Sequence, residues 1–132
     1  MRMLFVNLQV ADLAVSRDFF GKLGFTFNEA FSGEQSLCVV VADNISVLLA
    51  TPEHFGEFVV GEVADARKTT EVLLAVSADS REEVDQMLAA ALSNGGREWK
   101  PVQDHGFMYG ASFADPDGHV WEVVWMDPSA TG

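Results

Sequence analysis

The sequence is short of the residues that would cross-link the chain or draw it to a polyanion. It has one cysteine, Cys38, which lies in an apolar run and cannot form a disulfide within the chain, so we interpret it as a packed thiol. Lysine and arginine number 8 against 20 aspartates and glutamates. The net charge of −12 repels phosphate backbones and anionic membrane surfaces, and we expect no nucleic-acid or membrane partner.

Long apolar runs are also lacking. No segment approaches the roughly 20 apolar residues that a membrane span requires, and the N-terminal residues show no signal-peptide pattern. We therefore expect a cytoplasmic protein. With 132 residues, 48% of them hydrophobic and 21% charged, the composition is that of a globular domain with one sizeable core or two small repeated modules.

The first half of the chain follows the order βαβββ. Residues 3–10 alternate between apolar and polar and predict a half-buried strand. Asp12 is a candidate N-cap and Gly24 a candidate stop for a short amphipathic helix between them. Three strand-like runs follow, at residues 25–31, 36–42 and 45–50.

The second half repeats this order after residues 52–70, which have no clean period and which we interpret as a connector. Residues 71–76 predict a strand, whose alternation matches that of residues 6–10 at an offset of 66. A capping box at residues 80–83 begins the second helix. Strand-like runs follow at residues 97–100, 107–113 and 119–126. We predict one domain over residues 1–132, with module 1 at about 1–51 and module 2 at 71–128.

The last strand carries a single carboxylate, Glu122, in the apolar run WEVVW after the turn Asp115-Pro116-Asp117-Gly118. A duplicated βαβββ module with this ending resembles the vicinal oxygen chelate superfamily, which includes glyoxalase I, extradiol dioxygenases, fosfomycin-modifying enzymes and bleomycin-binding proteins. Within it, the chain looks most similar to the bacterial glyoxalase-like branch. The resemblance spans nearly the whole chain and implies an α+β fold with a curved mixed sheet around a cleft.

The resemblance also implies metal ligands on the first and last strands of each module. These positions fall at Phe5, at about Leu48, at Glu71 and at Glu122. Only the two glutamates can bind a metal, whereas a divalent catalytic centre needs three or more N or O ligands. We therefore leave the cofactor open and expect no tightly bound divalent metal.

Alternation along the strands places Glu71 and Glu122 on the faces turned to the cleft. Two acids brought close in a partly apolar cavity raise the pKa of one of them, which produces a general acid or base. The alternative is that each glutamate pairs with a basic residue such as Arg2 or Lys100, or meets water. Both interpretations stay open from the sequence.

Further candidate ligand contacts are mostly aromatic. Phe5 and Asn7 share one face of the first strand, and His105 stands at the start of the strand-like run 107–113. We interpret the other histidines, His54 and His119, as solvated or capping residues. The remaining candidates are Trp99, Phe107 and Tyr109.

Two functions fit these residues. The first is a glyoxalase-like enzyme for a small molecule, a lyase, isomerase or dioxygenase in which the glutamates hold a metal or move a proton. The second is a binding protein of the bleomycin-resistance type, which sequesters a small molecule without chemistry. The resemblance further implies a homodimer, since such sheets leave exposed edges.

Overall fold

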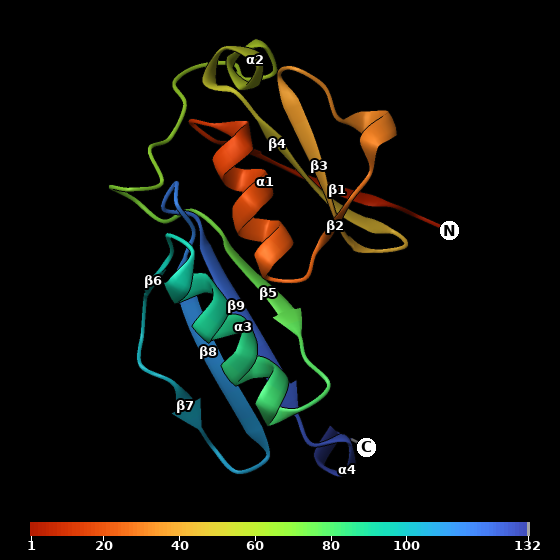
Figure 1. The fold of residues 1–132 in the computed structure, drawn as a ribbon, viewed down its shortest axis with the longest axis vertical. Helices are drawn as coiled ribbons and strands as arrows, with labels where there is room; N and C mark the ends of the chain where they lie inside the picture. The colour runs from red at the N-terminus through yellow and green to blue at the C-terminus, as the bar shows by residue number, and fades with distance from the viewer. Residues whose placement is uncertain (132) are drawn as a thin grey trace. The chain divides into compact units, whose positions relative to one another are not determined.

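The computed structural model describes residues 1–131 and divides into two compact units, Met1–Ala64 and Asp65–Gly132. In each unit one long helix lies against a mixed sheet (Figure 1). The boundary falls inside the expected connector. The predicted α+β class is confirmed, and so is the duplicated βαβββ order, except that the second unit has one additional two-residue strand.

Unit 1 has a four-stranded sheet in the order β1-β4-β3-β2, in which β1 and β4 are parallel and the other pairs antiparallel. The Asp12 side chain caps α1 by accepting from the backbone N–H of Ala14 at 2.9 Å, and Gly24 ends the helix region with a φ of 98°. The elements are β1 (Leu4–Gln9), α1 (Leu13–Lys22), β2 (Thr26–Phe27), η1 (Glu29–Phe31), β3 (Ser36–Ala42), β4 (Ile45–Ala50) and α2 (Pro52–Glu57).

The core of unit 1 forms between α1 and one face of this sheet. Phe19 and Phe20 of α1 are fully buried, with their rings edge to face at 5.0 Å between centroids. Alternate strand residues complete this core: Leu8, Val10, Leu37, Val39, Val47 and Leu49. The single cysteine, Cys38, is buried in β3, as its apolar surroundings predict.

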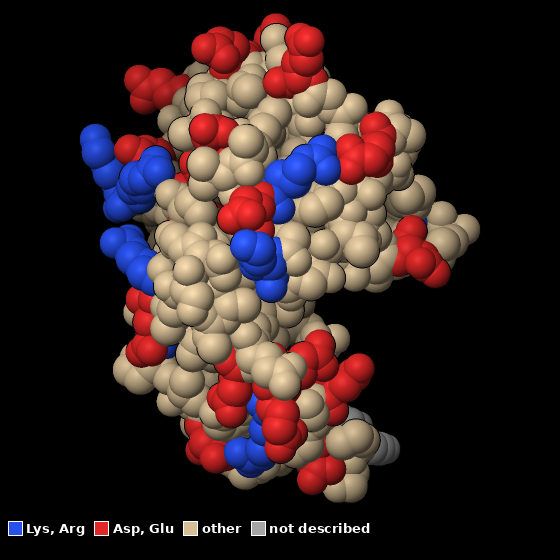
Figure 2. Space-filling model, viewed as in Figure 1, with Lys and Arg blue, Asp and Glu red and all other residues tan. Residues whose placement is uncertain are grey.

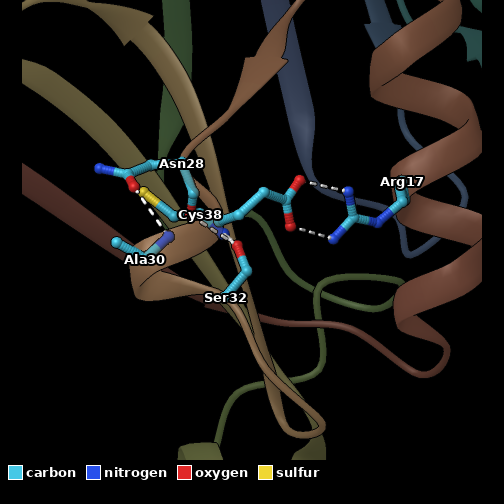
Figure 3. Close-up of polar contacts among 6 residues, drawn as sticks. Arg17, Asn28, Ala30, Ser32 and Cys38 are labelled. Atoms are coloured by element: carbon cyan, nitrogen blue, oxygen red, sulfur yellow. Dashed lines mark hydrogen bonds and ion pairs between the residues drawn. The ribbon is translucent and has the colours of Figure 1, made fainter.

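The predicted strand over residues 25–31 is wrong beyond Phe27. Asn28 accepts from the backbone N–H of Ala30 at 3.0 Å and so turns the chain into η1 (Figure 3). Ser32 then holds the turn against β3, because its hydroxyl accepts from the Cys38 N–H at 3.0 Å. An asparagine that bonds its own backbone competes with the strand ladder, which overrides the apolar pattern.

Unit 2 has the sheet order β5-β9-β8-β6, with β7 paired to β8 beyond β6. Here too the first and last strands, β5 and β9, are parallel. The elements are β5 (Leu73–Ser77), α3 (Arg81–Ser93), β6 (Arg97–Glu98), β7 (Gln103–Asp104), β8 (Met108–Ala114), β9 (Val120–Met126) and α4 (Pro128–Thr131). The expected strand over residues 97–100 is thus shorter, and β7 was not predicted.

Helix α3 covers one face of this second sheet. Its Val84 packs with Ala111 of β8 and Val123 of β9 in the centre of the core. The surrounding residues are Val76, Ala78, Met87, Leu88, Tyr109 and Trp125. Because side chains alternate along a strand, Glu122 and Val124 point to the opposite face.

The turn between β8 and β9 is held by Asp115. One carboxylate oxygen accepts from the backbone N–H groups of Asp117 and His119, both at 3.0 Å, and the other accepts from Nε1 of Trp121 at 3.1 Å. Gly118 takes a φ of 90°, where a Cβ would meet the backbone of Ala66 at 3.2 Å. Burial raises the pKa of the Asp115 carboxyl. The Asp-Pro-Asp-Gly motif therefore fixes the start of β9.

The repeat has an offset of 68 residues, and the predicted offset of 66 is wrong by two. The helix caps Asp12 and Ser80 are equivalent. The backbone bond from Val10 N–H to the Ala50 carbonyl, at 2.9 Å, likewise corresponds to the bond from Ala78 N–H to the Val124 carbonyl, at 2.8 Å. These bonds make Leu48 equivalent to Glu122, as expected.

Acidic side chains are spread over the visible surface of both units, with fewer basic ones among them (Figure 2). This distribution agrees with the net charge of −12. Across residues 1–131, no helix combines the length and apolarity of a membrane span.

Candidate functional site around Glu122

A cavity of about 50 Å³ opens on the face of the unit 2 sheet that α3 leaves uncovered. Strands β8 and β9 form its floor, and the segment between β6 and β7 forms its rim. This segment is held in place because β7 pairs with β8, with Gln103 opposite Gly110. The cavity is lined by Lys100, Pro101, Gln103, Met108, Gly110, Ala111, Ser112, Glu122 and Val124.

Glu122 is the only carboxylate among these lining residues. It lies in the middle of β9, opposite Ser112 of β8 on one side and Ala75 of β5 on the other. The side chain is half-buried, and its carboxylate makes no hydrogen bond or ion pair with any residue of the described chain. Neither Arg2 nor Lys100 pairs with it, so the ion-pair interpretation has no support within residues 1–131.

Ser112 and Lys100 add polar groups to the cavity. The buried Ser112 hydroxyl accepts from the backbone N–H of Lys100 at 3.1 Å, which leaves its own proton available for donation. The Lys100 ammonium lies 5.8 Å from the centroid of the Trp99 ring. Glu122, Ser112 and Lys100 therefore all belong to the lining of one small space.

Arg81 fixes the position of the rim. Its guanidinium forms two bonds with the Asp104 carboxylate, at 2.8 and 3.0 Å, and a third with the Gly106 carbonyl at 2.9 Å. It also stacks over the rings of Tyr109 and Trp125, at 4.9 and 5.2 Å from their centroids. The bond from Arg81 lowers the pKa of Asp104 to about 2. This clamp holds β7, and with it Gln103, beside β8.

Glu71 does not join Glu122. It precedes β5, is exposed, and lies four residues before Ala75, the residue that pairs with Glu122. At the rise of an extended chain, this separation is about 13 Å along the strand. The repeat offset of 68 makes Glu71 equivalent to Met3 instead of Phe5. The structure therefore gives unit 2 one cavity carboxylate where two were expected.

Tyr109 corrects another expectation, because it points to the opposite face of the sheet from Glu122. Its hydroxyl donates to the Asp85 carboxylate on α3 at 2.6 Å, and this bond raises the pKa of Tyr109. Trp99, His105 and Phe107 are exposed on the rim segment and the β7–β8 turn, outside the cavity lining. Of the six predicted ligand contacts, none lines this cavity.

Asn7 lines a separate cavity in unit 1, of about 160 Å³. Phe5 is exposed on β1 and is not part of that lining. His54, which we expected to be solvated or capping, lies on the cavity wall. The other lining residues are Phe31, Ser36, Leu48, Leu49, Ala50 and Phe58.

The residues at the four implied metal positions do not fit a divalent catalytic centre. Phe5 and Leu48 offer no donor atoms, and Glu71 stands four residues from the β5 position beside Glu122. Within the described residues, no three His, Cys, Asp or Glu side chains gather into a group that could hold a metal ion.

Several residues that line the cavity were not predicted from the sequence. Ser112 shares the alternation of Gly110 on β8, so its face could have been read from the strand pattern. Lys100 and Gln103 could not, because they come from an irregular segment that reaches the cavity through the Lys100 N–H bond to Ser112 and the pairing of β7 with β8.

The comparison with protein families decides the identity of this fold. The family model of the Glyoxalase/Bleomycin resistance protein/Dioxygenase superfamily matches residues 2–123. The chain belongs to this superfamily. The resemblance to the vicinal oxygen chelate superfamily is thereby confirmed. A comparison with curated protein sequences found no match.

Solved structures of other proteins share the fold. A hypothetical protein from S. aureus is 26% identical, with a TM-score of 0.80 over 95% of this chain and 94% of that one. A glyoxalase/bleomycin resistance protein/dioxygenase family enzyme from Burkholderia phytofirmans is 18% identical, with a TM-score of 0.79 over 96% and 99%. The fosfomycin resistance protein FosX from Listeria monocytogenes is 16% identical, with a TM-score of 0.69 over 98% and 96%. The last two show the fold alone.

Proposed function

We propose that this superfamily member binds a small polar molecule at Glu122 and holds it without changing it chemically. One observation carries the proposal, the half-buried Glu122 carboxylate that lines a cavity and has no partner within residues 1–131. A carboxylate without a protein partner is free to accept hydrogen bonds from a ligand that supplies a donor or a positive charge.

The chemistry of the lining defines the ligand. Glu122 accepts a hydrogen bond from an ammonium or hydroxyl group, and Lys100 attracts an anionic group at the rim. A small zwitterion, such as an amino acid, presents both. The cavity of about 50 Å³ holds only such a head group, since sites that enclose drug-sized molecules measure about 300 to 1,000 Å³. The remainder of a larger ligand extends out of the cavity.

The second candidate is a lyase or isomerase that uses Glu122 as a general base. The unpaired carboxylate favours it, because a base must be free to accept a proton from its substrate. Recovery of the ligand after incubation distinguishes the two functions. An unchanged ligand supports sequestration, and a converted one supports the enzyme.

Amide NMR of the full chain tests the proposal. We expect glycine at millimolar concentration to shift the amide signals of Ser112 and Glu122, and acetate or methylammonium alone to shift them less. The Glu122→Gln variant loses the response, while the matched variant Glu34→Gln, at an exposed site in unit 1, keeps it. The proposal fails if glycine, acetate and methylammonium all leave these signals unmoved, or if Glu122→Gln responds to glycine as the unaltered chain does.

A further inference from the structure

The cavity in unit 1 is larger than the cavity at Glu122 and different in kind. Its floor is the unit 1 sheet, with Asn7 of β1 paired to Leu48 of β4. Residues from η1 and from the α2 region complete the wall, among them Phe31, His54 and Phe58. No lysine, arginine, aspartate or glutamate lines it. A charged ligand would therefore lose water there without gaining a partner, which favours a neutral ligand.

The volume of the cavity and the residues that line it favour a ligand with a single ring. An apolar cavity of about 150 Å³ is large enough to bind benzene, and this one measures about 160 Å³. Two of its walls are aromatic, Phe31 and Phe58, and aromatic side chains pack well against flat ligands. Both phenylalanines are mostly exposed, at 57% and 66%, so a ligand would also remove apolar surface from water.

His54 supplies a directed polar contact. Thr51 caps its backbone N–H at 3.3 Å, and its ring stands edge to face with Phe58, at 4.9 Å between centroids. Its Nδ1 is buried without a hydrogen bond among the described residues and lies 3.4 Å from the Glu57 carboxylate. A neutral imidazole has one ring nitrogen that accepts a hydrogen bond, so His54 offers a ligand one acceptor.

Asn7 offers a second acceptor. Its side-chain nitrogen makes only a long bond, 3.4 Å, to the carbonyl of Phe5 on the same strand. Its side-chain oxygen receives no hydrogen bond from residues 1–131. A ligand that matches two free acceptors is a hydrogen-bond donor.

We propose that this cavity is a second ligand site and binds a neutral, single-ring aromatic molecule that carries one hydroxyl or ring N–H donor. The ring packs between Phe31 and Phe58, and the donor bonds His54, with Asn7 as a further acceptor in the lining. The site lies wholly within unit 1 and does not depend on ligand binding at Glu122.

Phenol is the probe, and amide NMR of the full chain is the measurement. We expect saturable shifts at Asn7, Leu48 and His54, with weaker binding of benzene, which has no donor, and of cyclohexanol, which has no aromatic ring. Benzoate, which is charged, should not bind. Equal affinities for phenol and benzene would contradict polar recognition, and phenol shifts confined to unit 2 would contradict the location.

Three variants sharpen the test. His54→Phe keeps the ring and removes the acceptor, so phenol should lose about tenfold in affinity while benzene loses little. Leu48→Phe fills the cavity and should abolish the binding of both probes. Glu122→Gln is the control and should bind phenol as the unaltered chain does. The dispersion of each amide spectrum shows that the variant is folded.

The proposal is overturned if folded Leu48→Phe or folded His54→Phe retains full phenol affinity. It is also overturned if Glu122→Gln loses phenol binding, since the probe would then occupy the other cavity. Failure of glycine to bind at Glu122 leaves these phenol outcomes unaffected.

Discussion

Replacing Glu122 by glutamine should leave the stability of unit 2 almost unchanged. The substitution keeps the size of the side chain and removes its charge. Because the carboxylate has no partner within residues 1–131, no buried partner is left without its counter-charge. We expect a change in the free energy of unfolding below about 1 kcal/mol, as for substitutions that break no structural network. Breaking a buried ion pair would instead cost about 3 to 5 kcal/mol.

Tryptophan fluorescence measures this change in the relevant part of the chain. All three tryptophans, Trp99, Trp121 and Trp125, lie in unit 2, so urea unfolding followed by their emission reports on that unit alone. Asp115→Asn is the positive control, because its carboxylate accepts three hydrogen bonds and an amide cannot accept all of them. That variant should lose about 1 to 3 kcal/mol. Glu34→Gln, exposed in unit 1, should leave the transition unmoved.

One pattern of results would refute the reasoning. If Glu122→Gln destabilises unit 2 as much as Asp115→Asn does and still binds the ligand, then Glu122 is a structural residue. The site assignment would then be wrong, because the carboxylate would have a partner that the arrangement of β8 and β9 does not provide.

Three further predictions follow from the same structure. The pKa of Asp104 is about 2 in the fold against an ordinary 3.8. The stabilising contribution of its carboxylate is therefore complete above pH 3.8 and is lost as the pH falls through 2. The difference in urea midpoint between the unaltered chain and Asp104→Asn should vanish over that range. We expect no divalent metal held tightly at one ion per chain, because Phe5 and Leu48 occupy two of the four implied ligand positions. The measurement is elemental mass spectrometry of protein purified without chelator. One zinc, nickel, iron or manganese ion per chain would contradict the prediction. We expect a homodimer, because β1 and β5 end their sheets with exposed apolar residues at Leu4, Phe5 and Leu73, and a monomer in sedimentation at micromolar concentration would count against it.

The sequence predicts the face of the sheet to which Glu122 points better than it predicts which residues lie beside it. Alternation is a local property of one strand, and the buried Trp121 and Val123 fix the face to which Glu122 does not point. The register between strands is not determined by this alternation. A shift by two residues preserves alternation completely, so the predicted offset of 66 agreed with the apolar pattern while misplacing Glu71.

Tyr109 and the rim residues show the other limit. The sequence marks Tyr109 as an aromatic residue on a strand, and its packing against the core and the bond from its hydroxyl to Asp85 show that it belongs to the α3 face. Gln103 reaches the cavity through a two-residue strand, β7, whose pairing is stabilised by the contact of Asp104 with Arg81, a residue distant in the sequence. No local pattern reports a contact of that kind.

The position of β9 inside its sheet has a consequence for how the protein is made. Strand β9 lies between β5 and β8, yet it is the last strand of this sheet to be synthesised. Unit 1 has all its strands once residue 50 is synthesised, and domains generally fold in the order in which they emerge. The second sheet lacks β9, the strand between β5 and β8, until residue 126 has been synthesised. A chain that terminates shortly before Glu122 would thus carry a complete first unit, and it would expose the edges of β5 and β8 that β9 normally joins.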